Sequence, residues 1–323
     1  MARPVQSVEK LIKEALPKDA KFLLAVSGGI DSMVLLHACY RLQGYILAKF
    51  EVAHVDHKLR KTSGADASFV KREAARLKIP FHLCRASKKK VRENVESWGR
   101  RIRYEFFAKV LKKRKLDWVL TAHQANDCAE TLIMRLVSNK EPRSISKIDE
   151  TRKVIRPLLT VPRTEIEVYA EEKKVSYRED ETNLDPKYLR NKVRHRILPV
   201  LAKEFDPRII EILAERADGI AQDIELLEIF ASRIAAKTIK FKWGGREWIT
   251  CIRRELSKIE FTIQWRVVEN LLFPKLGFKL GRRKGQAVVR FFLENIPRIE
   301  LPTGVILSRK NGEVNLRRSD DFV

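Results

Sequence analysis

Short apolar runs alternate with longer amphipathic stretches along the first 140 residues, and this alternation restricts the fold more than any other feature. Four runs have the length of buried strands and four segments have the length of helices, the strands at 21–26, 46–54, 80–84 and 117–122 and the helices at 31–42, 63–77, 95–113 and 126–137. Strands that alternate with helices form right-handed βαβ units. We therefore predict an α/β fold with a doubly wound parallel sheet.

The pattern changes in the second half of the chain. A long helical stretch begins at Asp206-Pro207, and Asn311-Gly312 between two β-like runs indicates a hairpin. A chain of 323 residues is long enough for about two domains. We predict an α/β domain at 1–204 and a smaller, mostly helical domain at 205–323.

The charge of the chain restricts its partners. There are 66 Lys and Arg against 42 Asp and Glu, a net charge of +24, so nucleic acid or an anionic membrane is the natural partner. The sequence contains no apolar run of the length that crosses a membrane and no apolar core of a secretory signal, so we expect no membrane partner. Because the four cysteines lack CxxC spacing, we expect a reducing, cytoplasmic environment.

A glycine loop is the first candidate site. Ser27, Gly28, Gly29, Ile30, Asp31 and Ser32 stand between the first apolar run and the first helix. Two glycines let the backbone approach a ligand closely, and the N–H groups at a helix start favour an anion. A tight turn with Asp31 or Ser32 as the helix cap explains the same residues without a ligand. The loop matches neither a Walker A motif nor GxGxxG.

A second candidate site follows the predicted strand at 117–122. His123 and Asp127 stand four residues apart and Glu130 three further on, so they share one face if the helix already runs there. Such a group can bind Mg²⁺ on phosphates or hold a cationic amine. The structural alternative is a helix whose first turn carries two acids that its dipole favours.

The SGGxDS loop resembles the pyrophosphate-binding loop of the N-type ATP pyrophosphatases, the PP-loop superfamily, which activate a carbonyl oxygen by adenylation. Further segments are similar to bacterial tRNA(Ile)-lysidine synthetases in the family's order: His54–Arg60 (HVDHKLR), Glu96 with Arg100, Arg101, Arg103 and Tyr104, His123–Thr131 (HQANDCAET), Arg156–Leu159, Glu179–Asn183 and Arg190–Arg194. The resemblance covers about residues 20–200, and the remainder matches only loosely, as in a short form of the family.

The resemblance implies a reaction and a set of site residues. The reaction is ATP-dependent ligation of free L-lysine to carbon 2 of the wobble cytidine of tRNA(Ile) with a CAU anticodon, through an adenylated cytidine, with release of AMP and pyrophosphate. ATP contacts are implied for the glycine loop, His54 and Arg103. Catalytic roles are implied for Asp31, which would also contact Mg²⁺, and for His123, which would contact phosphate. Asp127 and Glu130 would bind the lysine amine, and Asp127 would accept its proton.

Other features of the sequence bear on the RNA and leave points open. Arg190 and Arg194 stand four apart and can clamp RNA phosphate. Gln124, Asn126 and Cys128 depart from the family motif, and the polar segment 138–150 replaces its Gly-rich stretch, which leaves the cover of the lysine pocket open. The oligomeric state is open as well, a homodimer included.

Two other functions are compatible with parts of the sequence. A tRNA thiolase shares the loop, but thiolases usually carry cysteine pairs and this chain has none. An RNA-binding module with a vestigial nucleotide loop would explain the basic charge. The intact loop, together with His123 and Asp127, favours an enzyme instead.

Overall fold

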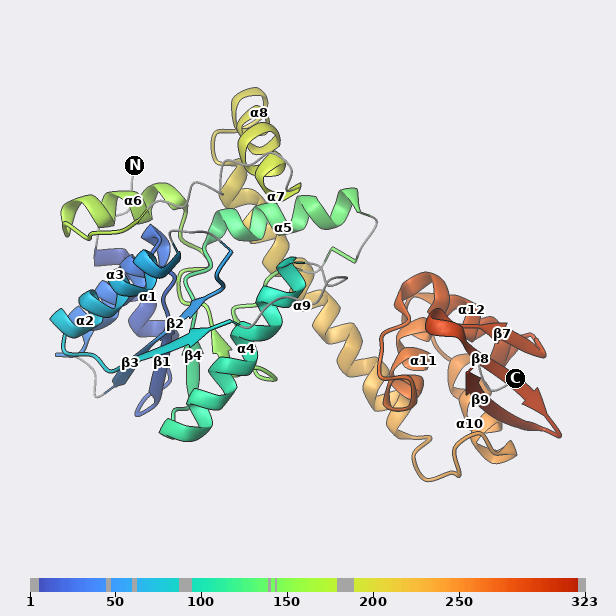
Figure 1. The fold of residues 1–323 in the computed structure, drawn as a ribbon. Coiled ribbons are helices and arrows are strands. Elements are labelled where there is room, and N and C mark those ends of the chain that lie inside the picture. Colours follow the sequence, from blue (N-terminus) through green and yellow to red (C-terminus); the bar gives the residue numbers. More distant parts are fainter. Residues whose placement is uncertain are drawn as a thin grey trace. The chain divides into compact units, whose positions relative to one another are not determined.

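The computed structural model describes residues 6–44, 48–59, 63–86, 95–138, 141–142, 144–178 and 189–318. The chain forms two compact units, Met1–Ala221 and Gln222–Val323, and helix α9 (Ile209–Ala236) contributes to both (Figure 1). The functional domains expected at 1–204 and 205–323 stay a prediction.

A six-stranded sheet with the order β3-β2-β1-β4-β6-β5 forms the centre of the first unit. Its strands are β1 (Lys21–Ala25), β2 (Lys49–Asp56), β3 (Phe81–Arg85), β4 (Trp118–Leu120), β5 (Ile148–Asp149) and β6 (Val154–Ile155). Neighbours from β3 to β6 pair in parallel, whereas β5 runs antiparallel to β6. The predicted α/β class is confirmed, with an antiparallel edge strand in the segment 138–150.

Helices cover both faces of this sheet (Figure 1). On one face lie α1 (Gln6–Ala15), α2 (Ile30–Leu42), α3 (Ser63–Arg76) and α6 (Arg163–Glu172), and on the other lies α4 (Val95–Arg114). The unit also contains α5 (Ala125–Val137), α7 (Leu189–Lys192) and α8 (Leu198–Glu204), with a π-helical turn at Val193–Ile197. Side chains of β1 alternate between the faces. Phe22 and Leu24 join the core with α1, α2, α3 and α6, whereas Leu23 packs with Phe107 and Val110 of α4.

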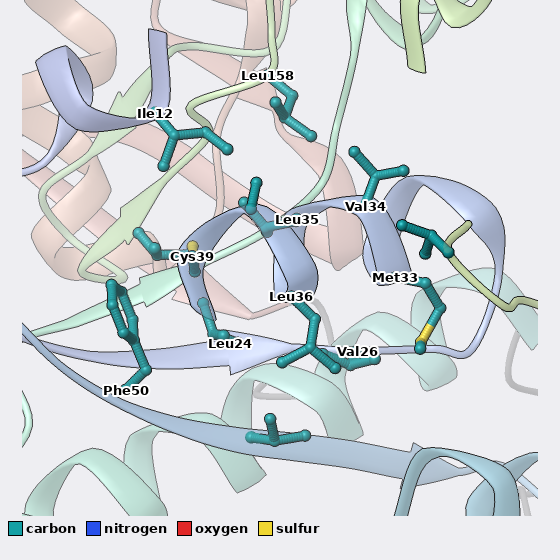
Figure 2. Close-up of a cluster of buried hydrophobic side chains, with 14 of the residues drawn as sticks. Ile12, Leu24, Val26, Met33, Val34, Leu35, Leu36, Cys39, Phe50 and Leu158 are labelled. Carbon is teal, nitrogen blue, oxygen red and sulfur yellow. The ribbon is translucent and has the colours of Figure 1, made fainter. Parts of the chain in front are cut away.

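Helix α2 is buried along most of its length, as Figure 2 shows for Met33, Val34, Leu35 and Leu36. A helix that is apolar on nearly every side is held by the core around it. The first turn of α2, directly after the glycine loop, is therefore fixed against the end of β1.

The strand order defines where a ligand can enter. From β1 the chain proceeds outward through β2 and β3, and then returns to place β4 on the other side of β1. Open α/β sheets bind ligands outside the carboxyl ends of the strands where the order reverses. That point lies between β1 and β4, so the glycine loop after β1 and His123 after β4 flank it.

The second unit combines the end of α9 with α10 (Arg246–Leu256), α11 (Phe261–Leu276), α12 (Gly281–Leu293) and an antiparallel sheet of β7 (Arg298–Glu300), β8 (Val305–Lys310) and β9 (Glu313–Arg318). The predicted mostly helical character and the hairpin are confirmed. Asn311 and Gly312 have φ of 56° and 80°, the positive values that a tight two-residue hairpin turn requires. Among the described residues, no helix is both long and apolar enough to cross a membrane.

Candidate active site

The glycine loop is bent back on itself by Ser32. The Ser32 hydroxyl donates to the Gly29 carbonyl at 2.9 Å and accepts from the backbone N–H groups of Ser27 and Gly28 at 3.1 and 3.2 Å. Gly28 has a φ of +100°, which a residue with a side chain rarely adopts. The Gly28 carbonyl in turn accepts from the N–H of Arg178 at 2.9 Å. The loop is thus held in one conformation from two sides.

The start of α2 carries no side-chain cap among the described residues, and Gly29 is the N-cap. The N–H groups of the first turn therefore point outward with the positive end of the helix dipole. Ser32 holds the turn through Ser27, Gly28 and Gly29 instead of capping the helix N–H groups, so the structural alternative is correct for the turn and not for the cap.

His54 supports the loop from β2. It is 4% exposed, and its Nδ1 lies 2.8 Å from the carbonyl oxygen of Val26, to which a protonated Nδ1 donates. Burial lowers the pKa of His54 below its usual value. A neutral imidazole thus ties the end of β1 to β2 directly beneath the loop.

Helix α5 begins at Ala125, so His123 precedes the helix instead of sharing a helical face with Asp127 as the sequence suggested. A capping box sets this start: the Asp127 carboxylate accepts from the Gln124 N–H at 2.9 Å, and the Gln124 side chain accepts from the Asn126 N–H at 2.7 Å. The structural alternative, in which Asp127 stabilises the first turn of the helix, is therefore correct. The same carboxylate also pairs with an arginine.

Two arginines from α7 and the following turn converge on the acids of α5. The Glu130 side chain is fully buried and accepts from Arg190 Nε at 2.5 Å and from Arg194 Nε and Nη2 at 2.6 and 3.2 Å. Arg190 Nη2 also lies 2.5 Å from Asp127 Oδ1. The arginines remain 35% and 31% exposed. The residues expected to bind lysine and those expected to bind RNA are thus paired with one another.

Asp31, in the first turn of α2, lies in the same electrostatic group. Its carboxylate accepts from Arg163 Nη1 at 3.0 and 3.1 Å. Burial raises the pKa of Asp31 to about 6, with Arg163 opposing the rise and the charge of Asp127 adding to it. Carboxylates that repel each other beside an anion-binding loop suit Mg²⁺, which takes one or two carboxylates together with phosphate oxygens. Across the described ranges, no group of three or more His, Cys, Asp or Glu side chains converges on a metal position.

His123 is a neutral side chain. Its Nδ1 lies 2.9 Å from the Thr121 hydroxyl. Burial, followed by the positive charges of Arg156, Arg190 and Arg103, lowers the pKa of His123 to about 3. Toward a phosphate it therefore acts as a hydrogen-bonding group without charge, in surroundings that several guanidiniums make positive.

The structure brings together most of the predicted site residues. Those that meet at the carboxyl edge of β1 and β4 are Ser27 to Ser32, His54, Arg103, His123, Asp127, Glu130, Arg190 and Arg194. Glu179–Asn183, Arg60 and the side chain of Glu96 lie outside the described residues. Sequence reasoning missed Arg163, although a basic residue in the first turn of a helix is unfavourable to the dipole and so indicates a specific partner.

Comparison with known proteins assigns this arrangement to a family. The PP-loop domain matches residues 2–201. The chain belongs to the PP-loop family. The glycine loop after β1, which resembles the PP-loop of this family, lies within the matched residues. So do Asp127 and Glu130 of α5, Arg190 of α7 and Arg194 of the following turn.

Curated relatives of this PP-loop protein include tRNA(Ile)-lysidine synthases. The one from Treponema denticola is 42% identical over 195 residues, which cover 58% of this chain and 42% of that protein. The one from Clostridium acetobutylicum is 30% identical over 287 residues, which cover 87% of this chain and 61% of that protein. The chain spans about half the length of the curated relatives it matches.

A solved structure shares the fold at greater distance. The U34-tRNA thiolase NcsA from Methanococcus maripaludis aligns with a TM-score of 0.56 over 68% of this chain and 80% of that chain, at 16% sequence identity. At this identity the likeness extends to the PP-loop fold and not to the chemistry, because one fold hosts many activities.

Proposed function

We propose that the protein ligates free L-lysine to the wobble cytidine of tRNA(Ile) in an ATP-dependent reaction. The observation that carries the proposal is the uncapped start of α2 with its PP-loop facing a group of paired carboxylates and arginines. A loop for phosphates, carboxylates for an amine and arginines for RNA are the parts this reaction needs. The similarity to tRNA(Ile)-lysidine synthases supports the choice of substrates.

Membership of the PP-loop family implies use of ATP. We assign its phosphates to the backbone N–H groups of the PP-loop and the first turn of α2, where the helix dipole favours negative charge. Neutral His123 and the exposed Arg103 would contact the same phosphates. Asp31 is the carboxylate that would hold Mg²⁺, and the bound ion would spread the charge of the leaving pyrophosphate. His54 would keep the loop at its height above the sheet.

The first chemical step is adenylation of the base. The O2 atom of the cytidine attacks the α-phosphorus of ATP, the bond to the β-phosphate breaks, and pyrophosphate leaves. The cytidine must be unstacked from its loop to enter the site. The raised pKa of Asp31 indicates that burial makes its ionised carboxylate unfavourable. A bound cation would stabilise the ionised form.

The second step is attack of the lysine ε-amine on carbon 2 with loss of AMP. Free lysine is a cation with a pKa of about 10.4, so its amine must lose a proton before it attacks. Asp127, which remains 15% exposed, is the acceptor that an incoming amine can reach, and the fully buried Glu130 adds negative charge behind it. Arg190 and Arg194 can pair with carboxylate or with phosphate. On binding, the lysine ammonium would pair with the carboxylates and the RNA phosphates would pair with the arginines, in place of the present ion pairs between them.

The test incubates the protein with ATP, L-lysine and unmodified tRNA(Ile), and analyses the nucleosides by mass. We expect lysidine and one AMP for each residue formed. Asp31→Ala should abolish AMP formation with the fold intact, whereas Asp223→Ala, which removes an exposed acid of α9, should not.

Two results would overturn the proposal. Incorporation of sulfur from a donor in place of lysine would assign the chain to the thiolases. RNA binding without any release of AMP would make it a binding module with an unused PP-loop.

A further inference from the structure

A cavity of about 790 Å³ opens at the edge of the sheet opposite to the PP-loop. It lies between the last turns of α4, the start of β4 and the turn before β6. Asp117, which precedes β4, accepts from the N–H of Lys21 at the first residue of β1. The cavity is therefore at the amino ends of the strands, and none of the residues assigned to ATP, lysine or RNA lines it.

Basic side chains dominate the rim of this cavity. Lys112 of α4 and Lys115, directly after this helix, are exposed, and within the part of the chain that the structure describes neither has an ion pair. The neighbouring Arg114 differs, because it is committed to Glu51 at 3.0 Å. Arg152 and Lys153 line the opposite side, and each pairs at 2.9 Å with an acid of its own turn. Lys112 and Lys115 thus remain for a ligand.

The walls of the cavity are aromatic. Arg152 lies over the Tyr104 ring at 5.1 Å from its centroid, and Lys153 lies over the Trp118 ring at 4.8 Å. Cations held on ring faces keep their positive charge available at the free side. A positively charged groove with aromatic and guanidinium planes is the pattern by which proteins hold single-stranded nucleic acid, with bases stacked and phosphates paired.

We propose that this cavity binds one nucleotide of the RNA substrate, its phosphate on Lys112 and Lys115 and its base against Arg152 and Trp118. The inference depends on the proposed function in one respect, that the substrate is RNA. The volume lies within the range of about 300–1,000 Å³ typical of pockets for ligands of nucleotide size.

The distance to the PP-loop suits a continuous RNA strand. Six residues separate Lys21, at the cavity edge of the sheet, from Ser27 of the loop. At about 3.3 Å per residue this is roughly 20 Å along β1, the axial length of about six stacked nucleotides at a rise of about 3.4 Å each. RNA that reaches the PP-loop can therefore also reach the cavity.

The experiment measures the affinity for unmodified tRNA(Ile) across a salt series. We expect Lys112→Glu with Lys115→Glu to weaken binding at least tenfold. The slope of log K against log salt should become shallower by about 0.7 if the one phosphate bound by these lysines is single-stranded or about 0.9 if it is in a duplex. Lys13→Glu with Lys18→Glu, which removes the same charge from exposed positions of the first unit, should change the affinity less than threefold.

Three results would overturn the inference. These are equal losses in both double variants, an unchanged salt slope, and a lost affinity for ATP with RNA binding intact, which would make the cavity a site for free nucleotides. A Lys112→Gln, Lys115→Gln variant and circular dichroism separate lost charge from lost folding. RNA binding that depends on the cavity in a protein that forms no lysidine would refute the proposed function and leave this inference standing.

Discussion

Glu130→Gln most directly tests the pairing of Glu130 with Arg190 and Arg194, because the change keeps the size of the side chain and removes its charge. Glu130 is fully buried and accepts three hydrogen bonds from two guanidiniums. Removing one partner of a buried ion pair costs about 3–5 kcal/mol. Here the arginines are about one-third exposed and Arg190 keeps Asp127, so we expect a loss of about 2–3 kcal/mol in the free energy of unfolding, below that range.

Glu105→Gln is the matched control. Glu105 pairs with Arg101 at 3.3 Å on the exposed side of α4, and both side chains are about half exposed. Exposed pairs of this spacing contribute about 0.3–0.5 kcal/mol. Unfolding in urea is monitored through hydrogen exchange of the α5 backbone amides, and this signal reports on the first unit alone. Equal losses in the two variants would refute the assignment of Glu130 as the centre of a buried network.

The same variant separates the two half-reactions. If Glu130 contributes to the lysine pocket, pyrophosphate release without lysine should survive in large part. The KM for lysine should rise roughly ten- to hundredfold, as expected for the loss of one charge-assisted contact of about 1.5–3 kcal/mol. Equal losses in both steps at an unchanged lysine KM would exclude this role and leave only the structural one.

Three further variants test the neighbouring groups. Because the pKa of Asp31 is raised to about 6, its ionised form destabilises the fold. At pH values above 6, Asp31→Asn should therefore raise the urea midpoint, and the gain should fade as the pH falls toward 3.8, the usual pKa of an aspartate. Arg163→Gln removes the charge that opposes this rise, so the acid limb of the pH profile of pyrophosphate release should move to higher pH. Gln124→Ala removes the cap of α5 and should cost about 0.5–2 kcal/mol in the same unfolding assay.

Local patterns predicted the fold well because each depends on neighbours in the sequence. The apolar runs and the turn at Asn311-Gly312 need only period and turn chemistry. The strands β5 and β6 were both missed because strands of two residues leave no periodic signal.

The partners within the candidate site could not be predicted in the same way. Arg190 and Glu130 are 60 positions apart, and Arg163 and Asp31 are 132 apart. A spacing of four between Arg190 and Arg194 indicates a shared face and does not say what that face meets. Only the fold brings α7 against α5, and only then do these arginines meet carboxylates.

The start of α5 shows the limit for a single residue. His123 and Asp127 are four apart, but the helix between them begins only after Gln124, an unusual cap that propensity rules do not favour. Gln124 is only 2% exposed, and its side-chain oxygen accepts from the N–H of Asn126. A buried N–H group needs such a partner, which is why glutamine can act as the cap here.

Helix α9 has a consequence for any attempt to divide the protein. Its first half packs Leu213 and Ala217 beside Cys128 and Leu132, and its second half places Ala231 and Ala235 in the other core. A fragment that ends at residue 204 would lack Leu213 and Ala217, so the apolar surface around Cys128 and Leu132 would be exposed to water. A fragment that ends at residue 221 would stop in the middle of α9 and leave the last carbonyl groups of the helix without partners. The second unit therefore cannot be exchanged at the boundary between the two units. A chimaera that carries the second unit of a relative has to take the whole of α9 from one parent protein.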